Sequence, residues 1–257
     1  MSDELDQKTW NTRIAVGKMA YDAGYYSQAA RHFRTAMEYA TEHNMEPSCL
    51  AINYVSLAKT LASMGNYKEA EQLLVKALAI DESLDEHGVD VAADYSELGM
   101  LYFKLGRLDE SRQYNEKCLQ IVSTFKEPPA FLYGKVLKQL AILKSEAGDL
   151  EGALVLIDQA IATIEHAHDG KNQLVYGEAL MVKTMLLVDL GREDEARELY
   201  PLALQIVEMN RGPFHPKVAT MMDMFATMTS NAGREKVSEY LKEKAQHIRD
   251  FGRRHKM

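Results

Sequence analysis

The chain has 257 residues, of which 46% are hydrophobic and 26% are charged, and this composition is typical of a folded chain rather than a disordered or collagen-like one. The sequence contains neither a long uncharged apolar run nor a secretory leader, so we expect a cytoplasmic protein with no membrane segment. A net charge of −8 disfavours nucleic acid and anionic lipid as partners.

Sites for catalysis or metal binding are not evident in the sequence. The two cysteines, Cys49 and Cys118, are too few for a disulfide framework and have no zinc-binding partners at the usual spacing. The phosphate loops, nucleophile elbows and dinucleotide fingerprints of common enzymes are missing. We therefore expect a non-catalytic protein without a cofactor.

One short pattern recurs along the whole chain. Successive occurrences are separated by 41, 41, 42, 43 and 42 residues, measured between the glycines Gly24, Gly65, Gly106, Gly148, Gly191 and Gly233. Apolar residues before each glycine are spaced by three or four positions, which is the period of one face of an α-helix. Each glycine is therefore predicted to end one helix in the left-handed conformation, just before the next helix begins.

Small residues occupy three positions of every repeat, counted from the glycine. Seven before it are Gly17, Ala58, Gly99, Ala141, Thr184 and Ala226. Five after it are Ala29, Ala70, Ser111, Ala153, Ala196 and Ser238, and twelve after it are Ala36, Ala77, Cys118, Ala160, Ala203 and Ala245. Because small side chains let two helix axes approach closely, these positions predict that the two helices of each repeat pack together.

In chain order, the predicted helix pairs cover residues 4–43, 47–84, 89–125, 129–168, 173–210 and 215–254. Segments rich in Gly, Pro, Asn and Asp separate them. A row of helix pairs in which each contacts only its neighbours grows as an α-solenoid with a concave inner groove. We therefore predict an all-α fold in which six antiparallel pairs form a single domain over residues 1–257.

The glycine corner and the two small residues after it resemble the tetratricopeptide repeat family. The repeat of about 42 residues and the segment Arg211–Ala219, with the sequence RGPFHPKVA, are similar to the kinesin-light-chain-like branch of that family. The resemblance implies a right-handed superhelix whose inner wall is formed by the first helix of each pair.

Residues 13, 10, 6, 3 and 2 positions before each glycine are predicted to face the groove. From this set the candidate partner-binding residues are Lys18, Tyr21, Val55, Lys59, Ser96, Met100, Phe103, Lys104, Lys135, Lys138, Met181 and Met185. Gln139 is added because, nine positions before its glycine, it stands where family members that clamp a carboxylate often carry a backbone-binding Asn. The other five repeats have no such residue at this position, so we do not expect a carboxylate clamp of the chaperone-binding kind. The lysines favour an acidic ligand, and the methionines and aromatic residues favour apolar anchors.

The functional hypothesis is an adaptor or assembly factor that holds an acidic peptide segment of another protein in this groove. One alternative is self-assembly, because apolar surface in the groove or at the ends of the array can pair copies of the chain. A weaker alternative is nucleic-acid binding through the inner lysines and the basic tail Arg249, Arg253, Arg254, His255 and Lys256.

Overall fold

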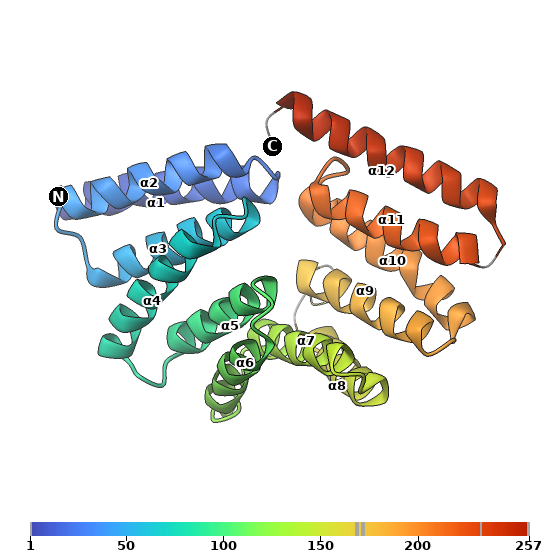
Figure 1. The fold of residues 1–257 in the computed structure, drawn as a ribbon. Helices are drawn as coiled ribbons and strands as arrows, with labels where there is room; N and C mark the ends of the chain where they lie inside the picture. The colour runs from blue at the N-terminus through green and yellow to red at the C-terminus, as the bar shows by residue number, and fades with distance from the viewer. Residues whose placement is uncertain (1, 168–169, 171–172, 232, 256–257) are drawn as a thin grey trace. The chain divides into compact units, whose positions relative to one another are not determined.

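The computed structural model describes residues 2–167, 170, 173–231 and 233–255. In this part of the chain all regular structure is helical, which confirms the all-α repeat fold (Figure 1). The helices are α1 (Ser2–Asp22), α2 (Tyr26–Glu42), α3 (Pro47–Ser63), α4 (Tyr67–Leu84), α5 (Val89–Lys104), α6 (Leu108–Val122), α7 (Ala130–Glu146), α8 (Leu150–Glu165), α9 (Leu174–Asp189), α10 (Glu193–Arg211), α11 (Pro216–Asn231) and α12 (Glu235–His255).

The helices group into two compact units, residues 1–128 and 129–257, and each unit holds three helix pairs. Unit 1 contains α1 to α6 and unit 2 contains α7 to α12. The prediction that all six repeats form a single domain with one continuous groove stays a prediction. Residue 168, the expected end of the fourth repeat, lies outside the described residues.

The six glycines adopt the predicted left-handed conformation, with φ between 71° and 84°. After each of them the chain closes the first helix by the same backbone bond, in which the residue following the glycine donates to the carbonyl five positions back. Tyr25 N donates to Ala20 O at 2.8 Å, and Arg107 N donates to Tyr102 O at 2.9 Å. The last carbonyls of the helix are satisfied in this way, and the second helix starts one or two residues later.

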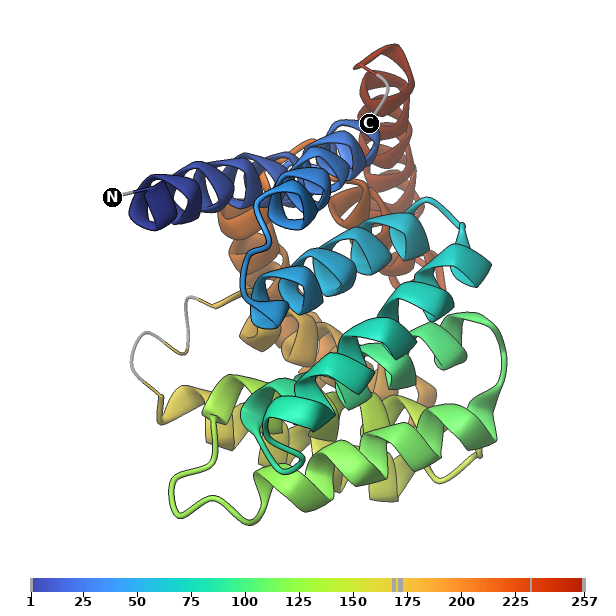
Figure 2. The same cartoon turned by 90° about the vertical axis from the view of Figure 1, so that its left-hand side faces the viewer.

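The small positions lie where the two helices of a pair cross. The six residues twelve after the glycine are all 0% exposed, and those five after it are at most 1% exposed. At Gly99, an added Cβ would come within 2.5 Å of the Asn115 side chain on the partner helix α6. The predicted close packing of each pair is therefore confirmed, and Figure 2 shows the paired helices of unit 1 side by side.

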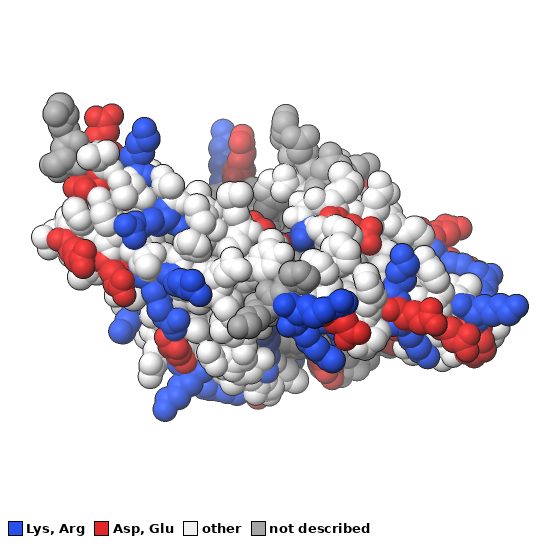
Figure 3. All heavy atoms as spheres, turned by 90° about the horizontal axis from the view of Figure 1, so that it is seen from above, with Lys and Arg blue, Asp and Glu red and all other residues white. Residues whose placement is uncertain are grey.

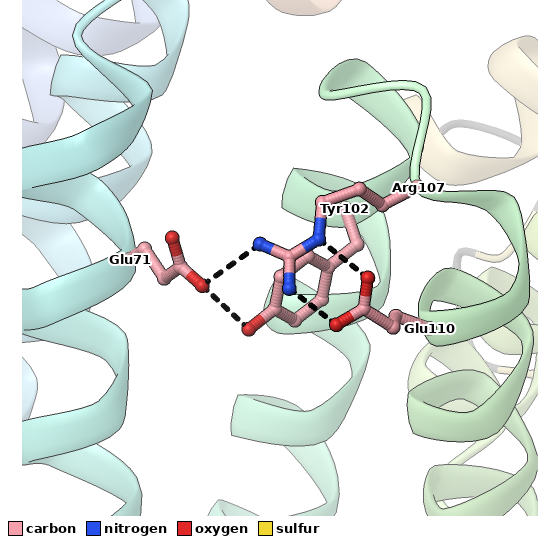
Figure 4. Close-up of polar contacts among 4 residues, drawn as sticks. All are labelled: Glu71, Tyr102, Arg107 and Glu110. Carbon is pink, nitrogen blue, oxygen red and sulfur yellow. Dashed lines mark hydrogen bonds and ion pairs between the residues drawn. The ribbon is translucent and has the colours of Figure 1, made fainter.

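Within a unit, the second helix of one pair packs against the first helix of the next, as α2 does on α3 and α4 on α5. A polar cluster joins the second and third repeats (Figure 4). Glu71 on α4 accepts hydrogen bonds from the Tyr102 hydroxyl at 2.7 Å and from Arg107 Nη1 at 3.2 Å. Arg107 also donates hydrogen bonds from Nε and Nη2 to the Glu110 carboxylate. Its guanidinium carbon lies over the Tyr102 ring, 4.4 Å from the ring centre.

A buried carboxyl pair lies at the same junction. Asp94 on α5 is 2% exposed, and its Oδ2 has no hydrogen-bond partner in the described part of the chain. The carboxyl of Asp81 on α4 lies close to it. Burial raises the pKa of Asp94 to about 8, and the negative charge of Asp81 adds to this effect. The neutral form of Asp94 is therefore more compatible with the folded state than the ionised form is.

Replacing Ala160 by Leu tests the helix crossing. Ala160 is 0% exposed, so we expect the larger side chain to force α7 and α8 apart and to lower the free energy of unfolding by about 1–3 kcal/mol. Urea unfolding followed by circular dichroism measures this change. Ala162→Leu, at an exposed position of the same helix, is the matched control and should change stability little. Equal stability of the two variants would contradict the close crossing.

Replacing Asp94 by Asn tests the buried neutral carboxyl. Because folding raises the pKa of Asp94 from 3.8 to about 8, its contribution to stability is present at low pH and is lost as the pH rises through this range. The free energy of unfolding should fall by roughly 1 kcal/mol per pH unit from about pH 5 to about pH 8. Asp94→Asn should flatten this slope and exceed the wild type in stability near about pH 9, because its neutral amide carries no charge to bury.

Urea titrations of both proteins across this pH range provide the measurement. Asp90→Asn, at an exposed position in the first turn of α5, is the control and should keep most of the wild-type slope. A wild-type stability that is constant over the range would show that Asp94 is not held neutral.

Candidate functional site

In unit 1, the residues predicted to face the groove lie on α1, α3 and α5, the first helices of three successive pairs. These helices contact each other directly, and the Tyr21 hydroxyl lies 3.4 Å from Ser63 Oγ of the next repeat. Lys18 and Lys104 are exposed, and Tyr21, Val55, Met100 and Phe103 are half-buried. We call these six residues the first-helix surface of unit 1.

Lys59 belongs to the same helix faces, but its charge is already paired. Its Nζ lies 3.0 Å from Glu97 Oε1 on the first helix of the next repeat. The Lys59 side chain is 40% exposed and that of Glu97 is 13% exposed. The basic character expected from the lysines is therefore reduced, because this carboxylate offsets one of the three positive charges.

In unit 2, the corresponding faces belong to α7 and α9, which are in contact. Lys135 and Met181 are half-buried, and Met185 is 41% exposed. Lys138 is an exception to the expectation of a solvated lysine, because its side chain is 6% exposed and forms an ion pair with Glu178 on α9. Lys217 on α11 pairs with the other oxygen of the same carboxylate.

Glu178 therefore joins the first helices of all three repeats in unit 2. Burial acts to raise its pKa, but Lys138 and Lys217 outweigh burial and hold the pKa below its ordinary value. Burial also lowers the pKa of the Lys138 ammonium, although Glu178 opposes this effect. A charge so enclosed and so closely paired holds neighbouring repeats together and is not available to a ligand.

Three of the predicted binding residues are buried, which corrects the expectation that they line an open surface. Ser96 is 0% exposed, Gln139 is 4% exposed and Lys138 is 5% exposed. Positions nine and ten before the glycine lie where adjacent first helices meet, so packing between repeats covers these side chains. The other ten residues are at least partly accessible, and their role in binding stays a prediction.

The segment that carries the kinesin-light-chain resemblance forms the turn between α10 and α11. His215 in this turn is 2% exposed, and its Nδ1 accepts a hydrogen bond from the backbone nitrogen of Lys217 at 3.1 Å. Burial lowers the pKa of His215 to about 4, and the positive charges of Arg211 and Lys217 add to the shift. The imidazole is therefore neutral near pH 7, and its role in the described structure is to begin α11.

The face drawn in Figure 3 carries charges of both signs. On the face drawn in Figure 3, basic and acidic side chains are interspersed and do not form a broad patch of one sign. In the basic tail, Arg249 pairs with Asp223 and Arg253 lies 3.5 Å from Asp250. Lys256 and the His255 side chain lie outside the described residues. These pairs remove part of the positive charge on which the nucleic-acid alternative depends.

Other kinds of site find little support in the described ranges. No group of three His, Cys, Asp or Glu side chains there is placed to hold a metal ion. None of the helices described has both the length and the apolar character needed to cross a bilayer. A shallow depression lies between α10, α11 and the start of α12, and it is lined by Glu193, Arg197, Phe225, Met228, Thr229 and Arg234. None of the predicted binding residues belongs to it.

Sequence reasoning missed the carboxylates that neutralise the inner lysines. Glu97 and Glu178 each occupy the first helix of the repeat that follows their lysine. A search for acidic residues about 40 positions after each inner lysine would have found both, because successive repeats place such residues side by side on adjacent helices.

Comparison with known proteins agrees with this architecture. Models of the tetratricopeptide repeat family match residues 54–82 and 90–166. A curated relative, Protein KINESIN LIGHT CHAIN-RELATED 3 of Arabidopsis thaliana, is 24% identical over 224 residues, which cover 86% of this chain and 34% of the relative. The chain thus spans about a third of the length of the curated relatives it matches.

Two solved structures share the fold. BtubC (BKLC) from P. vanneervenii has a TM-score of 0.59 at 19% identity, with 94% of this chain and 91% of that chain covered. The Rap conjugation gene regulator of the plasmid pLS20, in complex with the Phr* peptide, has a TM-score of 0.69 at 14% identity, with 96% and 75% covered. Together with the glycine corners and the repeat length, these matches show that the chain carries tetratricopeptide repeats over residues 54–82 and 90–166 and is similar in sequence to kinesin-light-chain-related proteins.

Proposed function

We propose that this protein is an adaptor or assembly factor, and that the first-helix surface of unit 1 binds a peptide segment of another protein. Tetratricopeptide repeats make the chain a protein-interaction module. The observation that carries the finer proposal is the composition of this surface, where half-buried Tyr21, Val55, Met100 and Phe103 lie on the same helix faces as exposed Lys18 and Lys104. The peptide-bound Rap regulator, which shares the fold, supports a peptide as the ligand.

The free energies of apolar burial and of exposed ion pairing indicate which part of the ligand contributes most to binding. Covering one large apolar side chain contributes roughly 1.5–3 kcal/mol, whereas an exposed ion pair contributes about 0–1 kcal/mol. One of the three lysines on these helix faces, Lys59, is already paired with Glu97. The proposed ligand is therefore a segment with one or two large apolar anchors, whose flanking carboxylates add orientation and a modest electrostatic gain.

Arrayed peptides containing an aromatic residue flanked by acidic residues test this proposal, and the best binder is then titrated by fluorescence anisotropy. We expect Phe103→Ala to weaken binding by about tenfold or more, because the apolar contact is lost. The double variant Lys18→Glu, Lys104→Glu should weaken binding by a smaller factor, roughly threefold to tenfold, and should reduce its dependence on salt.

Control variants lie on the second helix α4 of the same unit. Val75→Ala removes apolar surface from a side chain that is 49% exposed, and Lys68→Glu reverses an exposed charge. Both should bind like the wild type, and thermal melting checks that every variant folds. If Phe103→Ala and the lysine variant bind as tightly as the controls, the ligand does not contact this surface and the proposal fails.

A further inference from the structure

Helix α1 exposes a row of apolar side chains on the side away from its core. Leu5 is 64% exposed, Val16 is 39% exposed and Met19 is 71% exposed. The opposite side of the helix carries Trp10 and Ile14, which are buried in the core of unit 1. The exposed row is therefore a second apolar face of α1, which no described helix of unit 1 covers.

In the later repeats of unit 1 the same face is covered. The residues 12, 8 and 5 positions before the glycine are Thr12, Val16 and Met19 in the first repeat. Their equivalents are Asn53, Leu57 and Thr60 in the second repeat and Asp94, Leu98 and Leu101 in the third, and all six are at most 2% exposed. They are buried because the second helix of the preceding pair packs against that side. The exposed apolar face of α1 therefore corresponds to faces that pack against a helix in the later repeats.

The last helix of unit 2 is built differently. Its residues Glu239, Lys242 and Arg249 occupy the repeat positions where α2 has Ala30, Phe33 and Ala40. The three residues of α2 are at most 2% exposed, whereas Glu239 and Lys242 are exposed and the Arg249 side chain is 39% exposed. Such a charged face makes α12 a polar cap and a poor partner for the apolar face of α1. Head-to-tail stacking of copies is therefore disfavoured.

The spacing along α1 matches a helix-pairing seam. Leu5, Thr9, Thr12, Val16 and Met19 follow one another in steps of 4, 3, 4 and 3, which is the pattern of two helices packed along their length. We call these five residues the α1 seam. The Thr9 hydroxyl donates to Leu5 O and the Thr12 hydroxyl donates to Lys8 O, each at 2.9 Å. Both hydroxyls are satisfied within their own copy, and that of Thr9 also lies close to Tyr39 on α2, so neither needs a polar partner in a second copy.

We propose that the α1 seam pairs with the α1 seam of a second copy of this chain, antiparallel and related by a two-fold axis. In this arrangement large residues of one copy meet small residues of the other. Leu5 lies opposite Ala23, Met19 lies opposite Thr9, and Val16 lies opposite Thr12 of the second copy. A parallel pair would instead place Leu5 against Leu5 and Met19 against Met19, and would leave the threonine layers underfilled.

The charges beside the seam favour the same orientation. On one flank Lys8 and Asp22 are both exposed, and antiparallel pairing brings Lys8 of each copy close to Asp22 of the other. On the other flank, Asp6 accepts a hydrogen bond from the Tyr39 hydroxyl at 2.6 Å, and Arg13 lies 4.9 Å from the centre of the Tyr39 ring. These two side chains are held by α2 of their own copy. The pairing is isologous, so it closes at a dimer.

Sedimentation velocity over a concentration series tests the proposal with the full 257-residue chain. The wild type is expected to change from monomer to dimer as its concentration rises. Met19→Glu, and separately Leu5→Glu at the other end of the seam, should raise the dimer dissociation constant by about tenfold or more, because each places two charges in the interface. Met209→Glu is the matched control, since Met209 on α10 is 65% exposed and lies outside the seam.

Thermal melting shows that each variant is folded. A wild type that remains monomeric throughout the series overturns the proposal and leaves the face to another protein or to another part of the same chain. A dimer that both seam variants leave intact also overturns it, because the interface then lies elsewhere. Failure here leaves the peptide-binding proposal untouched, since the two concern different faces of α1.

The orientation is tested by exchanging charges. Lys8→Asp should weaken the dimer by placing a second carboxylate beside Asp22 of the other copy, and the double variant Lys8→Asp, Asp22→Lys should restore it. Ala15→Cys, close to the centre of the antiparallel pair, should form a disulfide-linked dimer on mild oxidation, whereas Leu5→Cys should not. Efficient linkage through Leu5→Cys and none through Ala15→Cys would show a parallel pair and refute the proposed arrangement.

Discussion

The close crossing of two helices at each left-handed glycine corner is the constraint on which the rest of this structure depends. The glycine allows the chain to reverse direction without a gap, and the small residues on both sides let the helix axes approach. A helix pair formed in this way has apolar side chains on two further sides, toward the preceding and the following repeat. Stacking follows because those sides must be buried, so local turn chemistry leads directly to a repeat fold.

Several contacts between repeats are polar. Glu71 with Tyr102 and Arg107 joins the second repeat to the third, and Glu178 with Lys138 and Lys217 joins the three repeats of unit 2. Because the enclosed charges of Lys138 and Glu178 must be paired, they favour one register between neighbouring repeats. The same pairing reduces the positive charge left on the first helices. A ligand of the proposed binding surface would therefore gain more from covering apolar side chains than from meeting lysines.

The first and last helices differ in a way that bears on assembly. Helix α12 carries charged side chains on the face that corresponds to the buried face of α2. Helix α1 instead carries an apolar seam whose threonine hydroxyls are satisfied internally. An adaptor that pairs through this face would present two copies of its peptide-binding surface together, and a partner with two binding segments would then be held more tightly than one with a single segment.

The sequence alone was sufficient for the helix pairs, their boundaries near the glycines and the close crossings. These features depend on residues near one another in the chain, namely a glycine with positive φ and small side chains at fixed offsets. Whether the inner lysines are paired depends on contacts between residues about 40 positions apart in the chain. Lys59 meets Glu97 and Lys138 meets Glu178 only because the rise from one repeat to the next brings adjacent first helices together. Likewise, Val16 is exposed while Leu57, its equivalent one repeat later, is buried. The repeat pattern is the same in both, and only the presence of a neighbouring helix in the folded chain distinguishes them.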